Sequence, residues 1–279
     1  MRIAAVQLHI DHDDKQVNWT RVEEFTKKAS EQGADLVVFP EYFLGGPTED
    51  KVEESVDSAL EQCCQIAKKY HIDLVPGTIM AREDGFVYNN CYYIDCSGEV
   101  LLSYRKVHLW HPERTLMKKG DQFNTCRNRF GIEVGLCVCW DIAFPEAFRE
   151  MALKKEAQLI IAPAYWTLED GGQVALNHDP LCEAKLLNAI GTARCVENSI
   201  VFVLCNGAYT GEVERRQPLG EMAGRTQISV PFKGPVAHLD HNREDMIIAN
   251  VDIEGITRDS ENIYRVREDW KNGLVFGQN

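Results

Sequence analysis

Three residues with complementary chemistry, Glu41, Lys106 and Cys139, each end an apolar, strand-like run. The runs are "ADLVVFPE", "LLSYRK" and "EVGLCVC". A carboxylate that accepts a thiol proton turns the sulfur into a nucleophile and can later activate water. A lysine beside both groups supplies positive charge for the thiolate and for a tetrahedral oxyanion. Together, the three side chains are sufficient for acyl transfer without a cofactor.

Two cysteines compete for the nucleophile's role, because Cys137 and Cys139 lie two residues apart in one apolar run. Strand alternation would place both on the same face. We favour Cys139, since it is the last residue of the expected strand and a helix start follows within a few residues. The backbone N–H of Trp140 would then lie beside the sulfur, favouring a thiolate and binding an oxyanion. Cys137 is interpreted as a core residue.

Three other interpretations of this region remain open. His108 and His111 could join the two cysteines as zinc ligands, although C-x-C with H-x-x-H fits the usual zinc spacing poorly. Cys137 and Cys139 could form a redox pair, although neighbouring strand positions seldom bridge well. The chain could also keep the fold of an enzyme and act as a binding protein without catalysis.

The elements that must position these residues alternate between strands and helices, and the order in the first half recurs in the second. Apolar residues at helical spacing predict helices, and short β-rich runs predict strands. The expected helices cover 13–32, 48–70, 145–155 and 179–198. The expected strands cover 2–8, 34–40, 72–80, 87–96, 99–106, 132–139, 157–164, 199–206, 226–232, 236–241 and 246–252.

This repeated order predicts an α/β fold with an internal duplication, in which each half is a sheet with two helices on one face. Two such halves packed sheet to sheet give a four-layer α-β-β-α sandwich. Residues 114–129 form the only long polar crossover, and no linker separates the halves. We therefore expect one domain over residues 1–279.

Composition narrows the range of partners. The formal net charge of −13 argues against binding nucleic acid or an anionic membrane surface. No apolar run reaches the roughly 18 residues of a membrane span, and the start of the chain does not have the pattern of a signal peptide. The ten cysteines are interpreted as reduced, mostly buried thiols, which predicts a cytoplasmic protein.

Over nearly its whole length the chain resembles the nitrilase, or carbon–nitrogen hydrolase, superfamily. The matching stretches are "FPEYFLGG" at 39–46, "YRKVHL" at 104–109 and "GLCVCWDIAFPE" at 135–146, supported by 160–166 and 193–206. The resemblance implies that Glu41 is the general base, Lys106 the lysine that stabilises the transition state and Cys139 the nucleophile. It also implies the α-β-β-α sandwich, assembled as a homodimer or a higher homo-oligomer.

The motif around the nucleophile narrows the expected reaction. Cys-Trp-Asp followed by Phe-Pro-Glu is similar to the amidase and N-carbamoyl amide hydrolase branches, and it differs from the Cys-Trp-Glu-Asn of nitrilases. An ATP-dependent synthetase does not fit, because the length leaves no room for a second domain. The resemblance thus implies hydrolysis of a small linear amide through a cysteine thioester, with release of ammonia. An N-carbamoyl amine or amino acid is the alternative substrate.

Four further residues are expected at the substrate. Glu113 matches a second glutamate that positions substrate in several amidases, although it could equally be a solvated loop residue. Tyr42, Trp140 and Tyr165, with Trp166, could line an aromatic-walled pocket, or they could pack in the core. An N-carbamoyl acid would need a cation for its carboxylate, and Arg114 and Arg149 are near only in sequence. No metal and no cofactor are expected.

Overall fold

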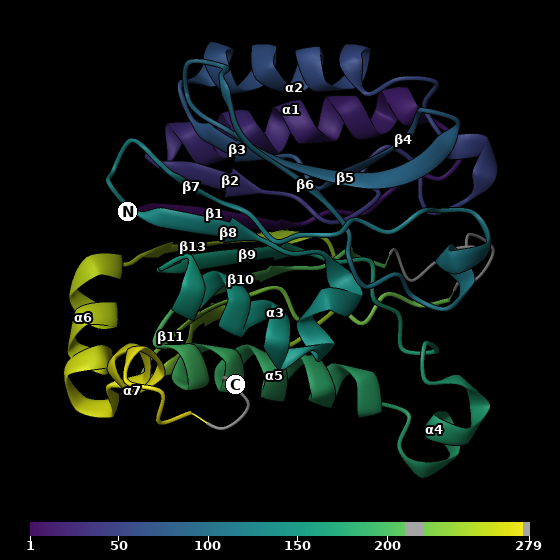
Figure 1. Cartoon of the computed structure of the whole chain (residues 1–279). Helices are drawn as coiled ribbons and strands as arrows, with labels where there is room; N and C mark the ends of the chain where they lie inside the picture. The colour runs from purple at the N-terminus through teal and green to yellow at the C-terminus, as the bar shows by residue number, and fades with distance from the viewer. Residues whose placement is uncertain (210–219, 276–279) are drawn as a thin grey trace.

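Two β-sheets lie face to face in the middle of the molecule, and helices cover their outer sides (Figure 1). The computed structural model describes residues 1–209 and 220–275. Helices α1 (Lys15–Glu31) and α2 (Asp57–Tyr70) cover the first sheet, and α3 (Pro145–Arg149) and α5 (Cys182–Asn198) cover the second. The predicted four-layer α-β-β-α sandwich is confirmed.

The first sheet consists of seven strands in the described part of the chain. Its order is β13-β1-β2-β3-β5-β4, with β6 also paired to β5. The bounds are β1 (Arg2–Gln7), β2 (Leu36–Val38), β3 (Asp73–Val75), β4 (Thr78–Glu83), β5 (Phe86–Ile94), β6 (Val100–Arg105) and β13 (Asp245–Asn250).

The second sheet consists of six strands in the same described ranges, in the order β12-β11-β10-β9-β8-β7. The bounds are β7 (Thr125–Arg127), β8 (Glu133–Leu136), β9 (Leu159–Pro163), β10 (Val201–Cys205), β11 (Gln227–Val230) and β12 (Gly234–His238). Every residue of β9 and β10 is buried. Parallel strands that are covered on both faces must be apolar throughout, which explains the unbroken runs in the sequence.

The two sheets repeat one pattern of strand directions. In each, three parallel strands are flanked on both sides by antiparallel ones: β1, β2 and β3 in the first sheet, and β8, β9 and β10 in the second. The two sheets do not correspond exactly to the two halves of the sequence, however. Strand β13 comes from the second half in sequence but pairs with β1, with Arg2 opposite Asn250.

Some expected elements differ from those observed. The expected strand 72–80 is divided into β3 and β4 by a turn that contains Gly77 at φ +95°. A Cβ atom on Gly77 would lie 1.9 Å from the carbonyl oxygen of Pro40, so only glycine lets the segment before Glu41 pass. The expected helix 48–70 begins at Asp57, and η1 (Glu49–Lys51) is a separate short turn.

Several short elements were not predicted from the sequence. Strand β7 lies inside the stretch interpreted as a polar crossover, and η4 (Glu150–Lys154) is a π-helical continuation of α3. The other unpredicted elements are η2 (Pro112–Thr115), η3 (Cys139–Ala143), α4 (Gly172–His178), α6 (Ile253–Tyr264) and α7 (Val266–Lys271). Helix α6 does carry a sequence signal, because Asp252 accepts a hydrogen bond from Gly255 N at 3.0 Å as its N-cap.

Helix α1 shows how local sequence fixes the outer layers. Asp14 caps it by accepting hydrogen bonds from the backbone N–H groups of Gln16 and Val17. Its buried face includes Trp19 and Val22, which pack against the first sheet. Each such apolar side chain stabilises the fold by roughly 1.5–3 kcal/mol relative to exposure. Among the helices of residues 1–209 and 220–275, none is long and apolar enough to cross a membrane.

Candidate active site

Glu41 lies just beyond the carboxyl end of β2, completely buried. Its backbone N–H donates to Ala164 O at 3.3 Å, which ties it to the second sheet. One carboxylate oxygen accepts from Asn89 Nδ2 at 2.7 Å and from Lys106 Nζ at 2.9 Å. The other accepts from the backbone N–H of Tyr165 at 3.0 Å. Residues from both sheets therefore fix this carboxylate.

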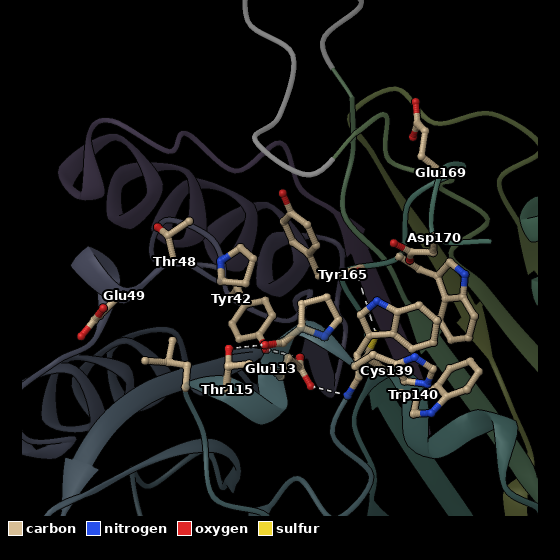
Figure 2. Close-up of a pocket in the computed structure, with 16 residues that line it drawn as sticks. Tyr42, Thr48, Glu49, Glu113, Thr115, Cys139, Trp140, Tyr165, Glu169 and Asp170 are labelled. Atoms are coloured by element: carbon tan, nitrogen blue, oxygen red, sulfur yellow. Dashed lines mark hydrogen bonds between the residues drawn. The ribbon is translucent and has the colours of Figure 1, made fainter. Parts of the chain in front are cut away.

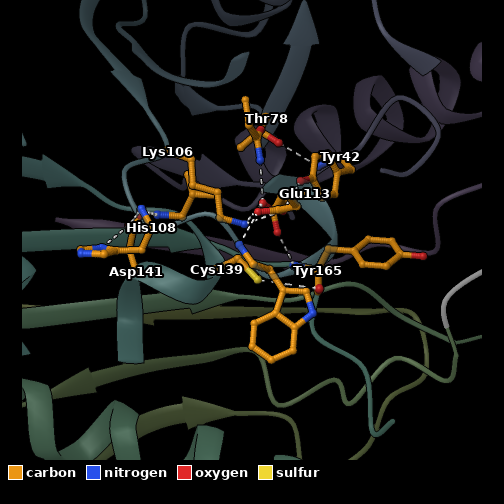
Figure 3. Close-up of polar contacts among 12 residues, drawn as sticks. Tyr42, Thr78, Lys106, His108, Glu113, Cys139, Asp141 and Tyr165 are labelled. Carbon is orange, nitrogen blue, oxygen red and sulfur yellow. Dashed lines mark hydrogen bonds and ion pairs between the residues drawn. The ribbon is translucent and has the colours of Figure 1, made fainter. Parts of the chain in front are cut away.

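Lys106 follows β6 and is 1% exposed. Its ammonium lies 2.9 Å from Glu41 Oε1 and 2.7 Å from Glu113 Oε1 (Figure 3). Burial opposes the charged form, but the attraction of Glu113 and Glu41 outweighs it, and the pKa of Lys106 lies well above its usual value. The lysine is therefore held as a cation between two carboxylates.

Cys139 does not end the strand as expected. Strand β8 ends at Leu136, and Cys139 is the first residue of η3 with φ +47°, in the left-handed region. This backbone conformation is uncommon for a residue with a side chain and is found at functional turns. It breaks the alternation that would have paired Cys139 with Cys137: Cys139 lines a cavity and Cys137 is completely buried.

The pKa values of the acidic groups in this cluster are strongly shifted. Burial raises the pKa of the Glu41 carboxyl to about 7, an effect that Lys106 opposes and Glu113 reinforces. Burial also raises the pKa of the Cys139 thiol well above its usual value, with the charge of Glu41 adding to the rise. A carboxylate with a pKa near neutrality beside a protonated thiol is suited to general base chemistry.

Glu113 belongs to the same cluster and is not a solvated loop residue. It lies in η2 and is 8% exposed. Its carboxylate accepts from Lys106 Nζ, from the backbone N–H of Trp110 at 2.7 Å and from the Tyr42 hydroxyl. Since the pKa of Tyr42 is raised well above its usual value by burial and by Glu113, the phenol remains a donor.

A cavity of about 610 Å³ opens above Cys139 (Figure 2). The expected substrate-binding residues Tyr42, Glu113, Trp140 and Tyr165 all line it, so the structure brings them together around the sulfur. The remaining lining residues are Pro47, Thr48, Glu49, Trp110, His111, Pro112, Thr115, Leu116, Trp166, Glu169 and Asp170. None of the described lining residues is a lysine or an arginine, and neither Arg114 nor Arg149 is among them.

Sequence reasoning missed two buried polar residues beside the site. Asn89, in β5, donates to Glu41, and its backbone oxygen accepts from Lys106 N at 3.0 Å. Asp141, in η3, is completely buried beside Cys139. An asparagine pair inside an apolar strand, and an acid two residues after the cysteine, were the available signals.

The zinc and redox interpretations find no matching geometry in the described ranges. One ring nitrogen of His108 lies 2.8 Å from Asp141 Oδ1, and the His111 ring stacks on Trp110 with centroids 4.7 Å apart. Within residues 1–209 and 220–275, no group of three His, Cys, Asp or Glu side chains is arranged to hold a metal ion. Cys137 and Cys139 are free thiols.

A sandwich of two sheets with a buried Glu, Lys and Cys beside a cavity defines a class of hydrolase, and comparison with known proteins agrees. The family model for carbon-nitrogen hydrolases matches residues 2–260. The chain therefore belongs to the carbon–nitrogen hydrolase family. The predicted function class, an enzyme that hydrolyses carbon–nitrogen bonds, is confirmed.

Individual relatives extend over the same length. A probable nitrilase of Schizosaccharomyces pombe is 28% identical over 96% of this chain and 94% of that protein. The 2-oxoglutaramate amidase of Bacillus subtilis is 27% identical over 90% of this chain and 91% of that protein. A solved amidase from Nesterenkonia sp. AN1 has a TM-score of 0.77 and 26% identity, covering 97% of this chain and 99% of its own. A mutant of that amidase shows acrylamide added at the active site cysteine.

Proposed function

We propose that this chain hydrolyses a small linear amide through a thioester on Cys139, with release of ammonia. The observation that carries the proposal is the buried cluster in which Lys106 lies between Glu41 and Glu113 beside the sulfur. The relatives support the same chemistry, since two of them are named amidases, and a mutant of one shows acrylamide added at its active site cysteine. The proposed steps need no metal or cofactor.

In the first step Glu41 takes the thiol proton and the thiolate of Cys139 attacks the amide carbon. The developing oxyanion is stabilised by the Lys106 ammonium and by the backbone N–H of Trp140. The carbon–nitrogen bond then breaks, and the nitrogen takes the proton from Glu41 to leave as ammonia. A carboxyl pKa of about 7 suits both transfers, because the group can accept and return a proton near neutral pH.

In the second step a water molecule replaces ammonia beside Glu41. The carboxylate takes a proton from this water while the oxygen attacks the thioester carbon. The carbon–sulfur bond breaks, the sulfur recovers its proton from Glu41, and a carboxylic acid is released. Lys106 remains charged throughout, since its two carboxylate neighbours hold its pKa high.

We assign Glu113, Tyr42, Trp140 and Tyr165 to substrate binding. Glu113 is fixed by Tyr42 and Lys106 and offers a carboxylate edge that can accept from the amide nitrogen. Trp140 and Tyr165 provide apolar walls that exclude water, which strengthens the electrostatic interactions inside the cavity.

The charge of the cavity favours some amides over others. Glu49, Glu169 and Asp170 line it, and Asp170 is held by hydrogen bonds from Thr167 N at 3.0 Å and Thr167 Oγ1 at 2.8 Å. Burial raises the pKa of Asp170 to about 6, so it is mostly ionised at neutral pH. An uncharged amide is therefore favoured. The second candidate is an N-carbamoyl amine that carries a further free amino group, whose ammonium would be attracted by these acids. A substrate that carries a carboxylate is disfavoured.

A screen of ammonia release tests the chemistry and the preference together. Butyramide, 4-aminobutyramide and succinamate share a four-carbon chain and differ in the group at its far end, which is neutral, cationic and anionic, respectively. We expect kcat/KM for succinamate to be at least about 10-fold lower than for the other two, as expected for an unpaired charge of the wrong sign. Faster turnover of succinamate than of butyramide would contradict the charge preference and leave the amidase proposal intact.

Replacement of the two cysteines tests the nucleophile. Cys139→Ala should abolish turnover, and Cys137→Ala should lower stability while keeping activity, because only Cys139 lines the cavity. Intact-mass detection of an acyl adduct, localised to Cys139 by peptide mapping, distinguishes an enzyme from a silent binding protein. Equal loss of activity in two folded variants would overturn the assignment.

We further propose that the chain is a homodimer in the cytoplasm. Apolar side chains are exposed on α5 and just before it: Leu181 at 46%, Leu186 at 40% and Val196 at 38%. Such side chains suit a subunit contact. Sedimentation of the purified protein and of Leu186→Lys tests this, since a dimer should weaken in the variant; a wild-type monomer would contradict it.

A further inference from the structure

Asp141 accepts hydrogen bonds from its own turn and also from a second segment of the chain. It is completely buried, and both oxygens of its carboxylate are used twice. Oδ2 accepts from Tyr104 OH at 2.6 Å and from Val138 N at 2.8 Å. Oδ1 accepts from the backbone N–H and from the ring Nδ1 of His108, each at 2.8 Å. Four donors around one buried carboxylate satisfy it fully.

These donors come from two separate parts of the site. Tyr104 and His108 lie two residues before and two residues after Lys106. Val138 directly precedes Cys139, and Asp141 itself lies two residues after it. One carboxylate thus joins the segment that bears the lysine, which extends from the first sheet, to the turn that bears the nucleophile, which follows a strand of the second (Figure 3).

In the described part of the chain, no direct hydrogen bond joins the Lys106 ammonium to the Cys139 sulfur. The ammonium bonds to Glu41 and Glu113, and the sulfur lies 3.8 Å from Tyr165 O. Glu41 interacts with both the ammonium and the thiol, and the separation of the sulfur from the ammonium also depends on how the backbone segments that bear them are fixed. The N–H of Trp140 lies between Cys139 and Asp141 in the chain, so its direction depends on the same anchor.

The partners of Asp141 are themselves immobilised. Burial and the charge of Asp141 raise the pKa of Tyr104 well above its usual value, so its hydroxyl stays a donor. That hydroxyl also accepts from Val107 N at 3.0 Å. The ring of His108 stacks on Phe144 with centroids 3.8 Å apart and an interplanar angle of 8°. The anchor is thus rigid on the side of Lys106.

We infer that Asp141 is a positioning residue for the proposed reaction: its carboxylate sets the separation of Cys139 and Lys106 and aims the N–H of Trp140 at the oxyanion. The expected effect of Asp141 on turnover rests on the proposed function. Its expected effect on the position of the Cys139 sulfur rests on geometry alone. A displacement of about 1 Å between reacting groups is enough to slow a reaction about 100-fold.

Asp141→Asn is the direct test, because the amide nitrogen can no longer accept from the donors that face it. We expect kcat for butyramide to fall about 100-fold, with KM changed less than about 3-fold, since the cavity walls stay in place. Asp73→Asn is the matched control. Asp73 is also completely buried and accepts from a tyrosine hydroxyl, Tyr93 at 2.6 Å, but it lies at the opposite end of the first sheet.

A purely structural role for Asp141 predicts a different outcome. In that case both variants would lose stability towards urea, and kcat per folded molecule would stay within about twofold of wild type in each. That result would overturn the inference. Tyr104→Phe removes one donor and keeps the carboxylate, so it provides a milder variant, with an expected 3- to 10-fold loss of kcat, should Asp141→Asn fail to fold.

Alkylation by acrylamide separates this inference from the proposed function. The thiol of Cys139 adds across the carbon–carbon double bond, with sulfur bonding to the terminal carbon and a proton reaching the carbon next to the carbonyl. We expect the rate, followed by intact mass, to fall at least about 10-fold in Asp141→Asn and to stay unchanged in Asp73→Asn. An equal rate in all three proteins overturns the positioning role, even if wild type hydrolyses no amide.

Discussion

Buried carboxylates lie at both ends of the first sheet, each beside a cation. At the amino end of β3, Asp73 accepts from Arg129 Nε at 2.9 Å and from the Tyr93 hydroxyl. Beyond the carboxyl end of β2, Glu41 accepts from Lys106 at 2.9 Å. Burial raises the carboxyl pKa in both places. Burial and a shifted pKa are therefore common to the two ends and do not distinguish them.

The surroundings of the two pairs do distinguish them. The side chain of Arg129 is 37% exposed, so water screens its charge, whereas that of Lys106 is 0% exposed and is shared with a second carboxylate, Glu113. The cluster of Lys106 also borders a cavity that contains Cys139. A perturbed carboxylate thus marks a reactive site only where a nucleophile and space for a substrate adjoin it.

The largest expected effect is the loss of kcat when the Glu41 carboxylate is replaced by a neutral amide. Glu41→Gln keeps the shape of the residue and removes the proposed base, and we expect kcat to fall by about 10³-fold, within the usual range for general base catalysis. Steady-state ammonia release measures the change, and circular dichroism verifies folding. A loss of less than 10-fold would show that another group takes the thiol proton.

Loss of the cation at the amino end should affect stability rather than rate. Arg129→Leu leaves Asp73 buried with one charged partner fewer, which should lower the free energy of unfolding by about 1–3 kcal/mol. Urea unfolding measures this change. The value of kcat for the folded variant should stay within about twofold of wild type; a large fall would mean that the two ends are coupled.

The pH dependence of the reaction should depend on Glu41, beyond the carboxyl end of β2, and not on Asp73. In the proposed mechanism Glu41 acts as a base, so its ionised form is required, and its pKa is about 7. Log kcat/KM should therefore rise with pH and level off above about pH 7, losing about tenfold per unit below it. A profile that stays flat down to pH 5 would contradict the assignment of Glu41, and the Asp73→Asn variant should show the wild-type curve.

The smallest expected effect concerns the second carboxylate of the cluster. The charge of Glu113 helps to raise the pKa of Glu41. In Glu113→Gln the acid limb of the kcat/KM profile should therefore move to lower pH, by less than about one unit because Lys106 partly screens the pair. The residual activity of the Glu113→Gln variant is sufficient to measure this shift. A shift to higher pH would indicate that Glu113 acts mainly by holding Lys106 in place.

Much of the site could be predicted because its three central residues follow apolar strands. Reactive groups collect at the carboxyl ends of strands, so each of the three could be assigned to a strand end from the sequence. Glu41 follows a strand of the first sheet and Cys139 a strand of the second, so their approach also depends on how the two sheets pack. The sandwich followed from the repeated order of strands and helices. The predicted aromatic lining by Tyr42, Trp140 and Tyr165 agrees with the cavity, which all three residues line.

The features that could not be predicted depend on contacts between residues far apart in the chain. Asn89 lies in none of the matching motifs, and Asp141 stands in the Cys-Trp-Asp motif without an assigned role. The importance of both comes from the partners that folding brings to them. Periodicity could not show the left-handed backbone of Cys139, because strand alternation presumes an extended chain. Nor could it show that Gly77 makes room for Pro40, which is a close approach between two separate loops.

The pairing of β13 with β1 has a consequence for biosynthesis. The amino group of Met1 donates to Val251 O at 2.9 Å, a contact between residues 250 positions apart. At ~5–20 residues per second, a ribosome needs about 12–50 s between these two points. Throughout that interval one edge of β1 lacks its native neighbour. A nascent chain in this state is exposed to intermolecular strand pairing, so translation speed and chaperone access should influence the yield of folded protein.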